Sequence, residues 1–326
     1  MRAALWPLER LYALSMRARG SMYDASVLRA SGAALPTLSV GNLTVGGTGK
    51  TPVAAWLARR LAGGARPAIV LRGYGGDEVA VHRALNPGIP VIAMPNRAAG
   101  VRLAQERGCD VVVLDDAFQH RRLVPTQSVL LVSAEQLERP RRLLPAGPWR
   151  EPLTCARRAD IAVITRKSAS SMGADESVGA LRRAAPAVPI AVVHLAPHAL
   201  VSATDERTLP LSELRGKDVV AIAAIGEPDL FARQLDQLGA RVHLVKFRDH
   251  YSFTNDDVRT LALNVRADAF AVCTLKDAVK LGHRWLGNSR LWYVSQRLVV
   301  EQGAEHIDRV LTRVLDARAS GTSRAG

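Results

Sequence analysis

The sequence predicts an α/β protein with a mostly parallel sheet, an N-terminal amphipathic helix and a second, smaller α/β domain. Short, apolar segments rich in β-branched residues alternate with helical segments along the chain. These short segments are apolar on both faces, which is typical of parallel strands covered by helices on both sides. The alternation occurs in two series, and the 326 residues suffice for one large domain or two modest ones.

The N-terminal segment, residues 1–35, is expected to carry a helix over residues 3–23. Apolar and tyrosine side chains recur on one face at helical spacing, and Arg10 and Arg17 lie opposite. This stripe consists of Leu5, Leu8, Leu11, Tyr12, Met16, Met22 and Tyr23. The helix either packs on its own domain, which is the commoner use of such a stripe, or lies in a membrane surface. The pattern alone favours packing.

The first α/β domain is expected over residues 36–202, and its helices have recognisable ends. Strands are expected at 36–40, 68–73, 90–94, 110–116, 128–132 and 161–165. A helix over 52–62 has Pro52 in its first turn, where a missing N–H costs nothing. A helix over 100–108 ends at Gly108.

The second series predicts a smaller domain over residues 218–316. Strands are expected at 190–195, 218–226, 240–247, 269–274 and 291–295, with helices at 229–238 and 255–266 between them. The polar residues 203–217 are expected to form a linker, and the small polar residues 317–326 a disordered tail.

Charge and cysteine content narrow the class of protein. The net charge of +14 is typical of proteins that meet nucleic acid, anionic lipid or phosphorylated substrates, although an arginine-rich proteome also produces it. Three distant cysteines, Cys109, Cys155 and Cys273, have no metal-ligand spacing and indicate a reducing, cytosolic setting. No run approaches the roughly 18–20 apolar residues of a spanning helix. Glu9 and Arg10 interrupt any signal peptide.

Residues 39–52, S-V-G-N-L-T-V-G-G-T-G-K-T-P, lie between an expected strand and an expected helix, which is the context of a phosphate-binding loop. Glycines let backbone N–H groups turn toward an anion, Lys50 can reach a terminal phosphate, and the Thr51 hydroxyl can bind Mg²⁺. The nucleotide-binding residues are therefore expected to be Thr44, Val45, Gly46, Gly47, Thr48, Gly49, Lys50 and Thr51. The domain is P-loop NTPase-like unless this is a glycine-rich turn with a chance Lys-Thr.

Two substitutions distinguish this loop from better-known forms. Thr44 stands where the strict G-x-x-x-x-G-K-[ST] pattern has a glycine. Val45 stands where partition-type and metallochaperone ATPases have a lysine, although the loop shape is similar. The loop thus predicts a nucleotide site of another class.

Acidic residues follow two of the expected strands. Asp115 and Asp116 end the strand over 110–116, where a carboxylate can hold Mg²⁺ or its water beside a phosphate loop. Their alternative role is to cap the next helix. Asp77 and Glu78 follow a glycine-rich turn and suit a base or a metal ligand, but an exposed acidic turn is equally compatible.

Three further motifs have both chemical and structural interpretations. His250, after Asp249 in F-R-D-H-Y-S-F-T, can relay a proton, although alone it is better taken as a surface histidine before a helix capped by Thr254. Thr274 and Asp277 resemble a capping box, and the neighbouring Lys276 or Lys280 can touch a nucleotide. Six arginines in residues 139–158, around the turn L-P-A-G-P, suit phosphates or form a solvated basic face.

The combination resembles the tetraacyldisaccharide 4'-kinase family, the lipid A 4'-kinases of Gram-negative bacteria. The resemblance rests on S-V-G-N-L-T-V-G-G-T-G-K-T-P, R-G-Y-G, G-D-E, D-D-x-F-Q-H-R-R-L, L-P-A-G-P-x-R-E-P, F-x-D-H-Y and T-x-K-D-A-V-K, and it runs from about residue 5 to about residue 300. It implies transfer of the γ-phosphate of ATP, with Mg²⁺, to the 4'-hydroxyl of a tetraacyl glucosamine disaccharide 1-phosphate.

The resemblance also implies partners and a location. The substrate is an anionic glycolipid, and no nucleic acid is involved. The enzyme is expected at the cytoplasmic face of the bacterial inner membrane, as a peripheral or monotopic protein with a membrane-facing N-terminal helix. The positive charge and the amphipathic helix agree with such a surface.

The resemblance implies roles for individual residues. Thr44 to Thr51 cradle ATP, with Lys50 on the phosphates. Thr51, Asp115, Asp116 and Glu78 serve the metal. Asp77 and His250 form the proton-handling pair near the attacking hydroxyl, since phosphoryl transfer otherwise needs mainly positioning and charge neutralisation.

The sequence departs from the family pattern at four places. R-G-Y-G and G-D-E are separated in the family, whereas Gly75-Gly76 fuses them here, so the placement of Asp77 depends on a shortened loop. Val79 replaces a proline, Ala117 a glycine and Leu275 a glutamate. Two rival functions remain: a P-loop ATPase of the partition or metallochaperone type acting as a nucleotide switch, and a non-enzymatic binding protein suggested only by the charge.

Overall fold

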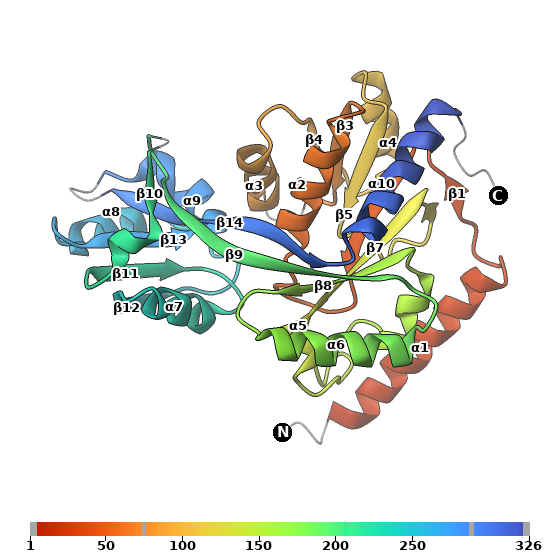
Figure 1. Ribbon diagram of the computed structural model, residues 1–326, viewed down its shortest axis with the longest axis horizontal. Coiled ribbons are helices and arrows are strands. Elements are labelled where there is room, and N and C mark those ends of the chain that lie inside the picture. The colour runs from red at the N-terminus through yellow and green to blue at the C-terminus, as the bar shows by residue number, and fades with distance from the viewer. Residues whose placement is uncertain (1–4, 74–75, 206, 287–289, 322–326) are drawn as a thin grey trace. The chain divides into compact units, whose positions relative to one another are not determined.

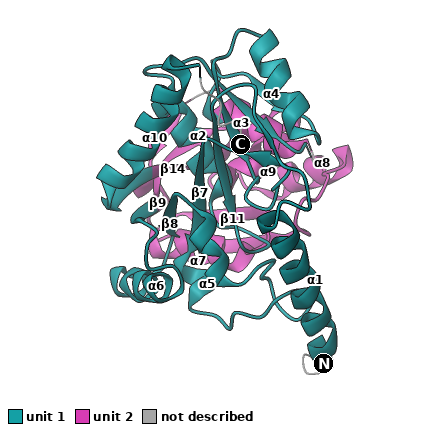
Figure 2. Cartoon of the chain, turned by 90° about the vertical axis from the view of Figure 1, so that its right-hand side faces the viewer, with its two compact units in different colours: residues 1–73, 85–194, 298–326 teal, residues 74–84, 195–297 magenta. Residues whose placement is uncertain are grey.

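The computed structural model describes residues 5–73, 76–205, 207–286 and 290–321, and an α/β architecture is evident throughout (Figure 1). The chain divides into two compact units (Figure 2). Unit 1 comprises residues 1–73, 85–194 and 298–326, and unit 2 comprises residues 74–84 and 195–297. Gly75 of the fused motifs lies outside the described residues.

Unit 1 is built on a sheet with β2 near its centre. Its strand order is β9-β8-β7-β2-β5-β3-β4, and these pairings are parallel. The strands are β2 (Thr37–Asn42), β3 (Pro67–Leu71), β4 (Val91–Ala93), β5 (Val111–Asp115), β7 (Gln127–Ser133), β8 (Ile161–Arg166) and β9 (Ile190–Ser202), and β1 (Ser31–Gly32) pairs with β6 (Leu123–Val124). The six strands expected in this part of the chain form, and their buried residues confirm the predicted two-sided burial.

Helices cover both faces of the unit 1 sheet. They are α1 (Trp6–Asp24), α2 (Lys50–Leu61), α4 (Arg97–Glu106), α5 (Ala134–Leu137), α6 (Ser171–Ala184), α10 (Ala304–Ala319) and the 3₁₀ helix η2 (Leu153–Arg158). Helices α4 and α6 pack their apolar side chains on one face, and α2 and α10 lie on the other. This layering explains why the strands are apolar on both sides.

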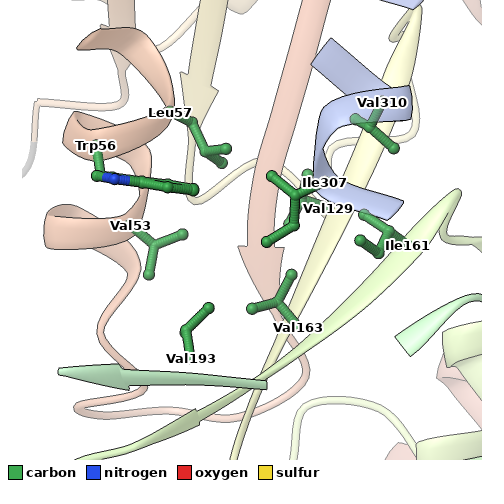
Figure 3. A pocket seen from close by; sticks show the side chains of 9 residues that line it. All are labelled: Val53, Trp56, Leu57, Val129, Ile161, Val163, Val193, Ile307 and Val310. Carbon is green, nitrogen blue, oxygen red and sulfur yellow. The ribbon is translucent and has the colours of Figure 1, made fainter. Parts of the chain in front are cut away.

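A small pocket lies between α2, α10 and strands β7, β8 and β9 (Figure 3). Its lining consists of Val53, Trp56, Leu57, Val129, Ile161, Val163, Val193, Ile307 and Val310. All nine side chains are apolar in character, so they offer no charged group to a phosphate or a metal ion. The pocket is a gap in helix–sheet packing and not a candidate nucleotide site.

The strands of unit 2 follow the order β12-β11-β13-β14-β9, and they are part of the same 12-stranded sheet that contains β8 to β4. Its strands and helices are α3 (Asp77–Leu85), β10 (Thr208–Pro210), η3 (Leu211–Leu214), β11 (Asp218–Ala223), α7 (Pro228–Gln237), β12 (Arg241–Lys246), α8 (Asn255–Asn264), β13 (Phe270–Thr274), α9 (Leu275–Leu281), η4 (Gly282–Arg284) and β14 (Leu291–Gln302). Helix α7 packs on one face of the strands, and α8 and α9 pack on the other. Strands β9 and β14 each contribute residues to both units.

The units differ from the expected boundaries in several places. Residues 74–84 and 195–202, which were expected in the first domain, belong to unit 2. Residues 203–217 do not form a free linker, because they contain β10 and η3, and Leu214 is buried in the core of unit 2. Helix α10 belongs to unit 1, where its apolar face packs beside α2. It continues to Ala319, so residues 317–319 are helical, while residues 322–326 lie outside the described part.

The apolar stripe expected on helix α1 is partly buried against the rest of unit 1 and partly exposed. Leu5, Tyr12, Met16 and Tyr23 are half-buried against unit 1, whereas Leu8, Leu11 and Met22 are exposed. Leu14 and Trp6 are exposed as well. The apolar residues therefore do not all pack on the domain, because their arc is wider than the strip of helix that contacts it. Among the described residues, the helices are too short or too polar to cross a membrane.

Candidate active site

The phosphate loop connects the carboxyl end of β2 to the first turn of α2. Gly46 and Gly49 have φ angles of +104° and +78°, which favour glycine, and Gly49 is the residue before α2 begins. Lys50 and Thr51 are the first residues of the helix, whose N–H groups and positive dipole end suit a phosphate. The predicted strand–loop–helix context of residues 44–51 is therefore present.

The buried Asn42 side chain connects the two ends of this loop. Its Nδ2 donates to Thr48 Oγ1 at 2.8 Å and to Thr44 Oγ1 at 3.3 Å, and its Oδ1 accepts from Lys50 Nζ at 3.3 Å. The Thr44 hydroxyl in turn donates to Gln136 Oε1. These contacts explain the missing glycine, because Thr44 uses its side chain to anchor the loop.

The L-P-A-G-P turn packs directly along the phosphate loop. Val45 N–H donates to the Pro148 carbonyl at 2.7 Å, and Arg150 N–H donates to the Leu43 carbonyl at 2.7 Å. Thr44 and Trp149 form an antiparallel bridge. The two sequence motifs thus support each other's backbone.

Several arginines of residues 139–158 have partners within unit 1. Arg158 donates to both oxygens of the buried Glu151 carboxylate, at 3.1 and 2.7 Å, and Arg142 donates to Glu9 on α1. Arg150 Nη1 lies 3.4 Å from both carboxylate oxygens of Asp116. The expectation of a solvated basic face is wrong for Arg150 and Arg158, whose side chains are largely covered.

Strand β5 brings the acidic pair beside the loop. It pairs with β2 in the register Val40↔Asp115, so Asp115 and Asp116 lie at the same sheet edge as the phosphate loop. Asp116 Oδ1 lies 3.6 Å from Lys50 Nζ. No helix follows Asp116 directly in the described chain, so the helix-cap interpretation is wrong.

The backbone at Asp116 is held in an unusual conformation. Its φ of +49° is uncommon for a residue with a side chain, and such strain often marks a functional position. Asp115 Oδ1 accepts the Asp116 N–H at 2.8 Å. Gly41 of β2 allows the segment after Asp116 to approach, because a Cβ there would lie 2.6 Å from the Phe118 nitrogen. The turn is thus fixed by packing as well as by hydrogen bonds.

The oxygen atoms near the loop fit a magnesium ion. Mg²⁺ prefers hard oxygen ligands and usually takes one or two carboxylates, waters and substrate phosphates. Asp115, Asp116 and Thr51, the three expected ligands in unit 1, carry carboxylate and hydroxyl oxygens of this kind. Glu78, the fourth expected ligand, belongs to unit 2. Among the described residues, no group of three His, Cys, Asp or Glu side chains forms a metal cluster.

The end of β8 contributes residues that the sequence did not reveal. Thr165 Oγ1 donates to the Thr48 carbonyl at 2.9 Å, and Lys167 Nζ donates to the Gly47 carbonyl at 2.6 Å. These two bonds fix the carbonyls of Gly47 and Thr48 and so hold the backbone of the loop in place. The sequence pointed to these residues only in that Thr165 ends the strand expected over residues 161–165.

Glu135 supports the segment that carries Lys167. Its Oε1 accepts N–H groups of Lys167, Ser168 and Ala169, at 2.6, 3.0 and 3.2 Å, and its Oε2 accepts the Ser133 hydroxyl. Burial alone would raise the pKa of Glu135, but these hydrogen bonds lower it overall. The carboxylate therefore stays ionised and keeps the segment in place.

A second cluster of polar residues lies within unit 2. Asp77 begins α3 and its side chain is 3% exposed. Its Oδ2 lies 3.1 Å from His250 Nδ1, and Lys276 Nζ lies 3.0 Å from His250 Nε2. Asp77 is therefore not part of an exposed acidic turn. His250 is a surface histidine before a capped helix, as expected, and it also contacts Asp77 and Lys276. Thr254 caps α8 as predicted, with a full capping box to Asp257.

The fold and these side chains define a nucleotide-binding enzyme of the P-loop class. A glycine loop follows a central parallel strand, and its lysine lies beside the aspartate that follows the neighbouring strand. A family model described as tetraacyldisaccharide-1-P 4'-kinase matches residues 1–84 and 75–315, and the chain belongs to this family. It is therefore a kinase that uses ATP and Mg²⁺. The two matched stretches overlap over residues 75–84, which begin at the Gly75-Gly76 pair that fuses the two motifs.

Individual relatives agree with this assignment. The chain is 39% identical over 294 residues to a tetraacyldisaccharide 4'-kinase of Anaeromyxobacter sp. strain K, covering 81% of this chain and 77% of the relative. It is 35% identical to the tetraacyldisaccharide 4'-kinase of Anaeromyxobacter sp. strain Fw109-5, and the match covers 99% of this chain and 94% of the relative. A crystal structure of LpxK from Aquifex aeolicus in complex with ATP is 28% identical, with a TM-score of 0.76 over 96% of this chain and 99% of that one.

Proposed function

We propose that this kinase transfers the γ-phosphate of ATP to the 4'-hydroxyl of a tetraacyl glucosamine disaccharide 1-phosphate, a precursor of lipid A. The observation that carries the proposal is the phosphate loop, with Lys50 Nζ 3.6 Å from Asp116, in a chain of this family. The nucleotide-switch alternative is less supported, because Val45 occupies the position of that class's signature lysine.

Residues of unit 1 hold the phosphate donor in this proposal. N–H groups of the loop from Thr44 to Thr51 surround the phosphates, and Lys50 neutralises charge on the group in transfer. Thr51, Asp115 and Asp116 would hold the magnesium ion. The ion, when bound, neutralises charge that develops on the phosphate oxygens.

Residues of unit 2 manage the proton of the acceptor. Asp77 accepts the proton from the 4'-hydroxyl as that oxygen attacks the γ-phosphorus, whose bond to the β–γ bridging oxygen breaks so that ADP leaves. His250 orients the Asp77 carboxylate through the 3.1 Å contact. A positioned base of this kind raises the rate by a factor of about 10²–10⁴. The chain's own groups thus supply anion binding, charge neutralisation and proton transfer.

Thin-layer separation of labelled products tests the reaction directly. With γ-labelled ATP and the disaccharide monophosphate lipid in mixed micelles, we expect the label to move into a lipid product. The control omits the lipid and should give little hydrolysis. ATP hydrolysis that does not depend on the lipid, with no labelled lipid formed, would contradict the kinase function and favour a nucleotide switch.

We also propose that α1 attaches the protein to the cytoplasmic face of the bacterial inner membrane. Polar contacts hold the helix on unit 1: Tyr12 Oη donates to the Arg150 carbonyl at 3.0 Å, and Glu9 Oε1 accepts the Leu143 N–H at 2.7 Å. The exposed side carries Leu8, Leu11 and Leu14, which are 52–65% exposed. Apolar side chains beside exposed arginines suit an anionic lipid surface.

Replacing Leu8, Leu11 and Leu14 together by serine should weaken co-sedimentation with anionic vesicles by about tenfold or more, because each buried leucine contributes roughly 1 kcal/mol or more. Activity on a short-chain, soluble acceptor should be retained. The matched control changes Met172, Leu263 and Leu286, which are exposed on other elements, to serine. Equal vesicle binding by the two triple variants would refute the role of α1.

A further inference from the structure

We propose that Lys276 is a positioning residue that fixes the tautomer of His250 and thereby leaves Asp77 as the proton acceptor. This inference rests on the proposed roles of Asp77 and His250, and it adds a residue and a protonation state to them. All the residues concerned lie in unit 2.

The contacts of Lys276 determine which nitrogen of His250 carries the proton. Lys276 Nζ lies 3.0 Å from His250 Nε2. An ammonium group has three donors and no acceptor, so Nε2 must be the unprotonated, accepting nitrogen. In a neutral imidazole the proton is then on Nδ1, from which it is donated to Asp77 Oδ2 at 3.1 Å. The other tautomer would direct an N–H at the ammonium and a lone pair at the carboxylate.

Asp249 keeps the lysine in this position. Its Oδ1 accepts from Lys276 Nζ at 3.0 Å, so the ammonium lies between a carboxylate and the imidazole ring. Lys276 Nζ is also 4.0 Å from Asp77 Oδ2. Its side chain is 25% exposed, so these charge contacts are only partly weakened by water. One cation therefore contacts both the histidine and its two neighbouring aspartates.

The same short helix that carries Lys276 also positions the backbone of His250. Asp277 Oδ2 accepts the Ala224 N–H at 3.2 Å, and the Ala224 carbonyl accepts the His250 N–H at 3.3 Å. Burial raises the pKa of Asp277, against hydrogen bonds from Thr274 and the charge of Lys280. His250 has a φ of +59°, a backbone conformation that residues other than glycine rarely adopt. The hydrogen bond to Ala224 therefore helps to hold the His250 backbone in this conformation.

The fixed tautomer assigns separate roles to the pair. With Nδ1–H donated to Asp77 and Nε2 occupied by Lys276, the imidazole has no free lone pair for the substrate proton. The Asp77 carboxylate can accept that proton, because each of its oxygens has a further lone pair. The hydroxyl proton therefore passes to Asp77, while His250 orients the carboxylate and Lys276 orients His250.

Kinetics of Lys276→Met test the functional side of the proposal. We expect kcat to fall about ten- to hundredfold, which is part of the roughly 10²–10⁴-fold rate factor that proton transfer contributes. The KM for ATP should stay within about twofold of the wild-type value. Lys276→Arg, which is also a donor without an acceptor, should recover at least part of the lost kcat. Lys246→Met is the control, because it removes an exposed lysine of the same unit that pairs with Asp229.

A spectroscopic measurement on the unliganded protein tests the tautomer itself. In ¹⁵N-histidine-labelled protein, the His250 signals, assigned by their absence in His250→Gln, should show the Nδ1–H tautomer. In Lys276→Met they should shift toward the Nε2–H form or a mixture. An unchanged tautomer with normal kcat would overturn the proposal, and so would a raised KM for ATP with normal kcat, which would make Lys276 a nucleotide contact. If the wild type makes no labelled lipid, the proposed function fails, while the tautomer result still stands on its own.

Discussion

Replacing Lys50 by alanine or methionine abolishes phosphoryl transfer and leaves the fold intact; this is the largest effect that we expect. The loss should be about 10³-fold or more in kcat, because a charged donor to the transferred phosphoryl group is worth at least as much as one oxyanion donor. Lys50 Nζ is held by Asn42 Oδ1 at 3.3 Å and faces Asp116 at 3.6 Å, so its position is set before ATP binds.

The measurement combines turnover, ATP binding and thermal unfolding. Arg60→Met is the matched control, since Arg60 is a cation on the same helix whose pair with Asp308 is exposed and contributes at most about 1 kcal/mol. We expect this control to retain activity. The unfolding temperature of Lys50→Met should lie within a few degrees of that of the wild type, because the lost contacts to Asn42 and Asp116 are partly screened by water. Near-normal turnover in Lys50→Met would contradict the assignment of the ATP site.

The local chemistry of the phosphate loop was predictable because it depends on residues that are close in sequence. Three glycines, a Lys-Thr pair and a proline in the first helical turn define the backbone conformation and the donors together. The neighbouring acidic strand was predictable for a similar reason, since apolar strands of a parallel sheet bring their carboxyl ends to one edge. The pairing of β5 with β2 confirms this.

The supporting contacts were not predictable, because they join distant parts of the chain. Thr165 is 117 residues from the loop carbonyl that it binds, and His250 is 173 residues from Asp77. Hydrophobic periodicity also cannot tell which sheet a helix covers, and so α10 was assigned to the second domain although it packs in unit 1. Such assignments need the three-dimensional path of the chain.

The shortened segment before Asp77 was the main open question of the sequence. Gly75 is outside the described residues, but Asp77 is described, begins a helix and lies 3.1 Å from His250. The missing segment therefore does not separate the two residues. Asp77 Oδ1 also accepts the Glu78 N–H at 3.1 Å, so both carboxylate oxygens are oriented.

Asp77→Ala and His250→Ala should each lower kcat by about 10²–10⁴, and their effects should not add. The reason is that His250 acts through Asp77: once the carboxylate is gone, the imidazole has nothing to orient. The double variant should therefore be close to Asp77→Ala alone. Thermal unfolding should change by a smaller amount for His250→Ala than for Asp77→Ala, because the His250 side chain is 46% exposed and that of Asp77 is 3% exposed.

Two controls make this cycle informative. Asp229→Ala removes an exposed carboxylate of the same unit that pairs with Lys246, and it should leave kcat unchanged. Asp77→Asn keeps the shape and the contact to His250 but removes the acceptor of the proton, so it should lose activity as completely as Asp77→Ala. Additive losses in the double variant would mean that the two residues act independently, and a fully active Asp77→Asn would mean that the proton leaves by another route.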